Sequence, residues 1–263
     1  MQFPSYLELC RLTWRQYLVR FDLILGLTLL IALPTHLIIS LVLPEIPALG
    51  EVTTAGELFQ IIITDPKIWA MLAWNVLSSA LLLILTTALM VVLRASYQRR
   101  SLRLQLIFQA TARYYFKILV TSILVGCLTA IGLVLFIVPG IIIGVYLSLA
   151  LPVVVWENKS PIAALRRSIE LVRGQARYVF IYILMTELLL SMIIWVLISI
   201  LPLTLPFEVF SLSVSSLINA FAIFFETVLY TACATWWNAE KMMTKVKTAA
   251  VANPESTKPE PKL

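Results

Sequence analysis

The stretch of sequence that decides the fold is YVFIYILMTELLLSMIIWVLISIL, residues 178–201, in which Glu187 is the only charged side chain. About twenty predominantly apolar residues are the length that an α-helix needs to cross a hydrocarbon core roughly 30 Å thick. The whole chain of 263 residues is 60% hydrophobic and 13% charged, whereas about a quarter of the residues in soluble domains are charged. The main solvent of this chain is therefore predicted to be a lipid bilayer.

Further apolar runs of this kind lie between the charged segments, so we predict an all-α integral membrane protein with six transmembrane helices. The predicted spans are residues 22–43, 68–93, 117–138, 141–157, 178–201 and 209–237, within a membrane domain at 1–247. The fourth span is short, and Pro139-Gly140 is predicted to form a tight turn between it and the third. Residues 248–263 are rich in Pro, Lys and Glu and have little to bury, which predicts a disordered cytoplasmic tail.

The basic residues predict the orientation of the spans, because Lys and Arg accumulate on the cytoplasmic side of a membrane. Six spans place 19 of the 20 basic residues on one side, together with both termini, and leave only Lys67 on the other. Since these residues flank membrane spans, the net charge of +6 indicates anionic lipid headgroups as partners, and not nucleic acid. The candidates for contact with such lipids, or with a membrane-protein partner, are Arg99, Arg100, Arg103, Arg166, Arg167 and Arg173.

Three cytoplasmic segments precede the outward spans, and each is predicted to be an amphipathic interfacial helix followed by a helical hairpin. The clearest is residues 160–174, where Ser160 and Pro161 suit the start of a helix and Gly174 suits its end. Its predicted apolar stripe consists of Ile162, Leu165, Ile169 and Val172. Such a helix would lie in the plane of the headgroups. An Arg followed by aromatic or apolar residues opens each unit, which favours a threefold repeat, but any cytoplasmic entry into a bilayer favours the same pattern.

Two carboxyl groups inside predicted spans are the main candidates for an intramembrane site. Glu187 lies nine residues beyond Tyr178 and Glu226 lies ten residues before Trp236, so a rise of about 1.5 Å per residue places both near the midplane. The polar residues that complete this candidate site are Asn75, Ser191 and Asn219. Ionisable groups inside spans are costly and often functional, which suggests a proton- or cation-linked site. The alternative is a structural role, in which a protonated Glu hydrogen-bonds to a neighbouring helix.

The motifs of the common catalytic chemistries are missing from the sequence. His36 is the single histidine, so there is no H-E-x-x-H zinc site, and no G-x-S-x-G elbow, P-loop or G-x-G-x-x-G motif is present. We expect no metal and no cofactor, and we favour a protein that is not an enzyme. His36 stands close to Pro34 and is predicted to be structural, either bonding the backbone carbonyls that the proline frees or reaching the outer interface.

One region carries a resemblance to a known family. The stretch FIVPGIIIGVYLSLALPVVVWENKSPIAALRRSIELVRG, residues 136–174, has a Pro-Gly turn, a span ending in Pro before an acidic residue, and then P-x-x-A-x-x-R-S followed by Gly. This pattern resembles the membrane domain of some bacterial glycerophosphoryl diester phosphodiesterases and the related YciC-like inner-membrane proteins. The resemblance implies a six-span module of a bacterial inner membrane. It implies no catalytic residues, and the soluble phosphodiesterase domain is absent from this chain.

The sequence leaves three functions open. The first is a non-enzymatic membrane module that acts through lipids or protein partners, as an assembly factor, a partner subunit or a lipid-organising protein. The second is a small transporter or channel that uses Glu187 and Glu226, which requires both carboxyls to face a hydrated cavity. The third is an intramembrane enzyme acting on lipid, which requires a pocket with convergent polar groups open to the headgroup layer.

Overall fold

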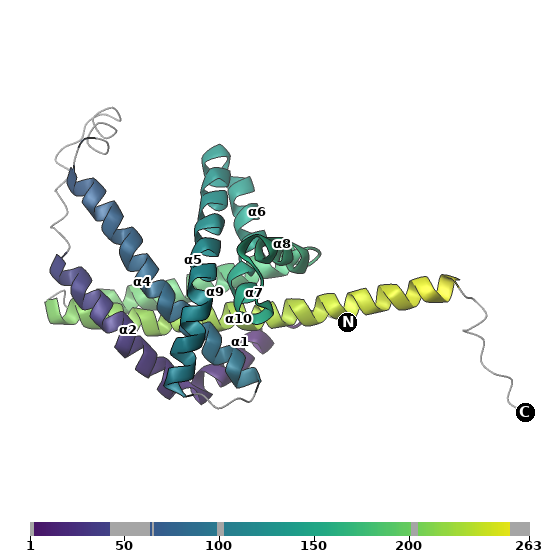
Figure 1. Cartoon of the computed structure of the whole chain (residues 1–263), viewed down its shortest axis with the longest axis horizontal. Helices are drawn as coiled ribbons and strands as arrows, with labels where there is room; N and C mark the ends of the chain where they lie inside the picture. Colours follow the sequence, from purple (N-terminus) through teal and green to yellow (C-terminus); the bar gives the residue numbers. More distant parts are fainter. Residues whose placement is uncertain (1–2, 43–63, 65, 99–102, 201–204, 253–263) are drawn as a thin grey trace, which may run out of the picture.

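The computed structural model describes residues 3–42, 64, 66–98, 103–200 and 205–252, which are almost entirely helical (Figure 1). The helices are α1 (Tyr6–Val19), α2 (Phe21–Val42), α4 (Pro66–Tyr97), α5 (Leu104–Leu135), α6 (Ile137–Leu147), α7 (Ala150–Glu157), α8 (Pro161–Val172), α9 (Ala176–Ile200) and α10 (Leu205–Ala252). Six segments of the described chain are long and apolar enough to cross a membrane: Phe21–Ile38, Ile68–Tyr97, Leu104–Leu135, Ile137–Glu157, Ala176–Leu197 and Ser213–Met243. These segments confirm the prediction of an all-helical chain with six candidate spans.

The core of the protein is organised around α10. This helix contacts α1, α2, α4, α7, α8 and α9, and its side chains Phe224, Phe225 and Leu229 are almost completely buried. Figure 1 shows α10 along the longest dimension of the molecule, with α5 running roughly at right angles to it in this view. Elements that are far apart in the sequence are therefore held to one another through α10.

The last helix is longer than the predicted sixth span. It continues to Ala252, so residues 248–252, which we assigned to a disordered tail, are helical. The remainder of the predicted tail, residues 253–263, lies outside the described residues.

The hairpin between α5 and α6 turns at Phe136, not at Pro139-Gly140 as predicted. Phe136 is in an extended conformation and α6 begins directly after it, so Pro139 and Gly140 lie in the first turns of α6. Proline is tolerated there because the first backbone N–H groups of a helix have no partner within the helix. A Cβ atom on Gly140 would lie 2.5 Å from the backbone nitrogen of Leu133. The glycine thus serves the close approach of α5 and α6, and not the turn.

Two of the three predicted interfacial helices are separate elements. The first is α1, which begins with a capping box in which Ser5 and Glu8 bond each other's backbone N–H groups. The second is α8. The middle segment, residues 104–117, is instead the first part of α5, which runs without a break to Leu135. No Pro or Gly lies in this segment to end a helix before the apolar run begins.

The buried face of α8 differs from the predicted apolar stripe. Leu165 and Val172 are buried as predicted, but Ile162 and Ile169 are 61% and 39% exposed. The buried face also includes Ser168, whose hydroxyl donates a hydrogen bond to a backbone carbonyl of α6. The side of α8 that packs against the other helices therefore includes a polar residue with a hydrogen-bond partner, while two isoleucines lie on the opposite, outward side.

Candidate functional site

A polar cluster joins the end of α7 to α8 and α10, with Glu157 at its centre. Glu157 Oε1 accepts hydrogen bonds from Arg167 Nε (3.1 Å) and from the hydroxyl of Tyr230 (3.0 Å), and Oε2 pairs with Lys159 Nζ at 2.8 Å. The side chains of Arg167 and Glu157 are only 10% and 23% exposed. Charges removed from water need such partners, because burial otherwise disfavours the charged form. One carboxylate thus fixes the relative position of three helices.

Arg167 is held by further groups on α8 and α10. Its Nη1 donates to Glu170 Oε2 at 3.0 Å, and its guanidinium lies 4.0 Å from the centre of a ring of Trp237. A cation within about 6 Å of an aromatic face is attracted by the ring quadrupole. We predicted Arg167 to contact lipid or a partner, but the structure uses this side chain to join α7, α8 and α10.

The turn between α7 and α8 brings the members of this cluster together. Asn158 caps α7 in the left-handed region, with φ 52°, which asparagine adopts more readily than most residues. Pro161 then opens α8 at its first position. The chain reverses direction within a few residues, which brings the side chain of Arg167 on α8 into contact with Glu157 at the end of α7.

A second polar contact lies at the end of α4. Arg94 Nη1 donates to the hydroxyl of Tyr114 on α5 (2.7 Å) and to the backbone carbonyl of Val155 on α7 (2.6 Å). Nearby, Lys117 Nζ donates to Asn158 Oδ1 at 3.0 Å. These bonds hold the end of α4, the first half of α5 and the α7–α8 turn against one another.

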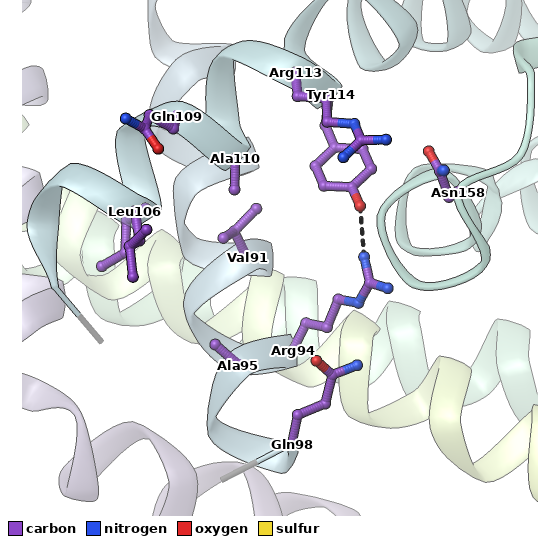
Figure 2. A pocket seen from close by; sticks show the side chains of 11 residues that line it. Val91, Arg94, Ala95, Gln98, Leu106, Gln109, Ala110, Arg113, Tyr114 and Asn158 are labelled. Atoms are coloured by element: carbon purple, nitrogen blue, oxygen red, sulfur yellow. Dashed lines mark hydrogen bonds between the residues drawn. The ribbon is translucent and has the colours of Figure 1, made fainter. Parts of the chain in front are cut away.

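A cavity of about 590 Å³ opens beside Arg94, between α4 and α5 (Figure 2). Its lining residues are Val91, Arg94, Ala95, Gln98, Leu106, Ile107, Gln109, Ala110, Arg113, Tyr114 and Asn158. Figure 2 shows the side chain of Arg94 extending toward Tyr114, with Gln98 below it and Asn158 to one side. The lining contains two guanidinium groups and three amides but no carboxylate. Among the described residues, neither Arg94 nor Arg113 forms an ion pair.

A second cavity, of about 580 Å³, lies between α1, α9 and α10. Its lining residues are Tyr6, Cys10, Arg11, Trp14, Tyr17, Thr186, Leu189, Leu190, Ile193, Leu217, Ile218 and Phe221. The hydroxyls of Tyr6 and Thr186 are 3.1 Å apart, and the hydroxyl of Tyr17 donates to the carbonyl of Leu217 at 2.9 Å. These bonds fasten α1 across α9 and α10, and they leave a largely apolar space.

The predicted intramembrane residues are only partly brought together. Glu187 lies on α9 and Glu226 on α10, two helices that pack against each other. Glu187 is exposed on the outside of the protein and Glu226 is partly buried, while Asn75, Ser191 and Asn219 are exposed. None of these five residues lines either of the two cavities. A transport site at Glu187 and Glu226 stays a prediction.

His36 has a clear structural contact. Its ring is buried, and Nε2 lies 2.8 Å from the hydroxyl oxygen of Ser216. This histidine therefore links α2 to α10 through a side chain, and not through a backbone carbonyl freed by Pro34.

Three of the six arginines predicted to contact lipid are exposed in the structure. Arg103, Arg166 and Arg173 are exposed, and Arg99 and Arg100 lie outside the described residues. Arg94 and Arg113 were not among the residues predicted to contact lipid, although both belong to the predicted cytoplasmic link between the second and third spans. The available signal was that each arginine adjoins a span end, but nothing in their separation of 19 residues indicates that they share a cavity.

The residues of the family-like pattern have structural roles in this chain. Gly140 allows α6 to approach α5, Glu157 and Arg167 form an ion pair, and Ser168 bonds a carbonyl of α6. Gly174, which follows α8, has φ +92° and faces a tryptophan of α10. The pattern thus assembles α6, α7 and α8. No family model, no curated protein and no solved structure matches the chain.

Proposed function

We propose that this protein is a non-enzymatic, multi-span membrane module that binds anionic lipid headgroups along one basic face, alone or together with a membrane-protein partner. Roles that fit such a module are an assembly factor, a partner subunit or a lipid-organising protein. The observation that carries the proposal is the outward face of α8. Ile162, Arg166, Ile169 and Arg173 are all exposed there.

The spacing of these four residues places them on a single face. Steps of four, three and four residues keep side chains on the same side of a helix. An exposed face that alternates large apolar side chains with arginines suits the boundary between headgroups and acyl chains, where the isoleucines leave water and the guanidiniums bind anionic lipid.

The outward face of α1 has the same character. Arg11, Trp14, Arg15 and Leu18 are exposed and lie three or four residues apart on one side of the helix. Two separate elements therefore present basic and apolar side chains together, as expected for a protein whose activity lies at the headgroup layer.

We place this face in the cytoplasm of a bacterium, at the inner membrane. In support, span ends that the charge pattern assigns to the cytoplasm contact one another, as in the bond from Arg94 to Val155 and the bond from Lys117 to Asn158. The resemblance to YciC-like proteins favours the same location. Both termini then lie on the cytoplasmic side.

The two other functions have less support. The packing of α9, which carries Glu187, against α10, which carries Glu226, is compatible with a transporter, but neither carboxyl lines the two cavities. The α4–α5 cavity gathers polar groups as an enzyme acting on lipid would require. Its lining has two guanidiniums and three amides but no His, Cys, Ser, Asp or Glu, which favours the binding of an anion over catalysis.

The proposal is tested by lipid enrichment around the full chain. The protein is placed in nanodiscs of mixed phosphatidylcholine and phosphatidylglycerol. It is then released from the nanodiscs, and the lipids that remain bound to it are identified by native mass spectrometry. We expect enrichment of phosphatidylglycerol on the wild type. Replacing both arginines in Arg166→Gln/Arg173→Gln should reduce this preference by up to about thirtyfold, at about 1 kcal/mol per charge.

The matched control is Arg166→Lys/Arg173→Lys, which keeps both charges and should keep the preference. A wild-type protein without enrichment of phosphatidylglycerol would contradict the proposal. Equal enrichment on the wild type and on the glutamine variant would show that α8 does not carry it.

A further inference from the structure

We infer that the cavity between α4 and α5 binds the phosphate group of an anionic lipid headgroup, with Arg94 and Arg113 as its charged ligands. This inference rests on the proposed function and names a specific site and chemical group for it. The cavity is distinct from the outward faces of α1 and α8, because none of their residues lines it.

Arg94 is held in place with part of its hydrogen-bonding capacity unused. Its two bonds to described residues, to Tyr114 and Val155, both come from Nη1. A guanidinium has five N–H donors in a planar fork, so Nε and Nη2 keep three donors without a partner among the described residues. The ring of Tyr114 lies 5.8 Å from the guanidinium carbon and further restricts its position. Such a fork matches the two oxygens that a phosphate presents.

The charge in and around the cavity is unbalanced. Arg94 and Arg113 line it, and the amine of Lys117 donates to Asn158, another lining residue. With its oxygen accepting from Lys117, the amide of Asn158 keeps its NH₂ group as a donor. Since no carboxylate is present in the lining, an anion is the ligand that would neutralise these groups.

The rest of the lining suits the parts of a lipid next to its phosphate. Val91, Ala95, Leu106, Ile107 and Ala110 form an apolar wall beside the arginines. The volume of about 590 Å³ lies in the range of roughly 300–1,000 Å³ that is usual for small-molecule sites. A basic cavity between span ends on the predicted cytoplasmic side lies at the depth of the headgroups. A phosphate can thus contact the arginines while the glycerol and the first acyl carbons contact the apolar wall.

The test uses the full chain in maltoside micelles, which contain no phosphate. Short-chain phosphatidylglycerol is titrated, and the bound fraction is measured by native mass spectrometry. Arg113→Gln removes an exposed guanidinium and should weaken binding at least about fivefold, the equivalent of about 1 kcal/mol. Gln109→Glu adds a negative charge to the same cavity and should also weaken binding. Arg177→Gln removes an exposed arginine that does not line the cavity and should change affinity by less than about twofold.

Two further probes separate a lipid from a free anion. Short-chain diacylglycerol has the acyl chains without the phosphate, and we expect it not to bind. Inorganic phosphate has the charge without the chains, and we expect it to bind more weakly than phosphatidylglycerol. Equal affinities for inorganic phosphate and phosphatidylglycerol would overturn the lipid assignment and identify a free phosphate ion as the ligand.

The outcomes also separate this site from the proposed function. If phosphatidylglycerol is enriched in nanodiscs but binds equally to the wild type, Arg113→Gln and Gln109→Glu, the cavity is not the site and the proposed function stands. If the wild type shows no enrichment in nanodiscs, the proposed function itself fails. Correct folding of each variant is verified by its thermal unfolding midpoint before titration.

Discussion

At Glu157 a single carboxylate binds Arg167, Tyr230 and Lys159, and thereby fixes α8 and α10 against the end of α7. Removing one member of a mostly buried ion pair lowers the free energy of unfolding more than replacing both members by apolar residues. The reason is that the remaining charge is left buried without its partner. These groups stabilise the protein, whereas Arg94 and Arg113 have donors without a partner among the described residues and are the arginines that we assign to a ligand.

Arg167→Gln is expected to lower the free energy of unfolding by about 3 kcal/mol, because it breaks the ion pair with Glu157 and removes the cation over Trp237. The measurement is reversible unfolding in micelles, followed by tryptophan fluorescence. Arg166→Gln, at the neighbouring exposed position, should change stability by less than about 0.5 kcal/mol. Equal losses for the two variants would show that the cluster does not stabilise the fold.

Tyr17 gives the protein a pH-dependent stability at alkaline pH. Its hydroxyl donates to Leu217, and burial raises the pKa of Tyr17 to about 12. Because the unfolded value is about 10, the contribution is fully present below pH 10 and is lost as the pH rises toward 12. The unfolding midpoint of the wild type should therefore fall more steeply across this window than that of Tyr17→Phe. Parallel slopes for the two proteins would contradict the burial of this hydroxyl and its raised pKa.

Among the elements, the α5–α6 hairpin is the one whose packing depends most directly on a glycine. Gly140→Ala would place a Cβ atom 2.5 Å from a backbone nitrogen of α5, and we expect a loss of about 1–3 kcal/mol. Gly126→Ala is the matched control on α5, because its Cβ atom would have no neighbour within 4 Å. It should be neutral, or stabilising by up to about 1 kcal/mol through helix propensity. Thermal unfolding of both variants tests this difference, and a Gly140→Ala protein as stable as Gly126→Ala would contradict the close contact.

The sequence could predict the helices and candidate spans because apolar length is a local property of the chain. It could not predict how helices pack. Pro139-Gly140 has the composition of a turn, yet Gly140 is required for contact with α5. On α8, Ser168 is buried against a carbonyl partner while Ile162 and Ile169 face outward.

The site was accessible to sequence reasoning only in outline. The charge pattern indicated a basic face, and Arg166 and Arg173 are exposed as that requires. The cavity depends on how the end of α4 and the start of α5 pack, and the burial of Arg167 depends on Trp237, which lies 70 residues away in the chain. Contacts of this range leave no periodic signal in a single sequence.

At the scale of the whole molecule, the end of α7 and the turn after it hold parts of α4, α5 and α8 together. Arg94, Lys117 and Arg167 come from three different helices, and each bonds a residue at the end of α7 or in the turn that follows it. This convergence concentrates positive charge at one part of the protein. A module of this kind would act by holding anionic lipids, or a partner that binds them, at that face.

The most direct test of this account is the structure of the protein in native nanodiscs, with co-purifying lipid and protein retained. The account predicts headgroup density beside Arg94 and Arg113 in the α4–α5 cavity, and lipid or partner density along the outward face of α8. A water-filled path that reaches Glu187 and Glu226 while the basic face is bare would contradict it and would establish the transporter alternative in its place.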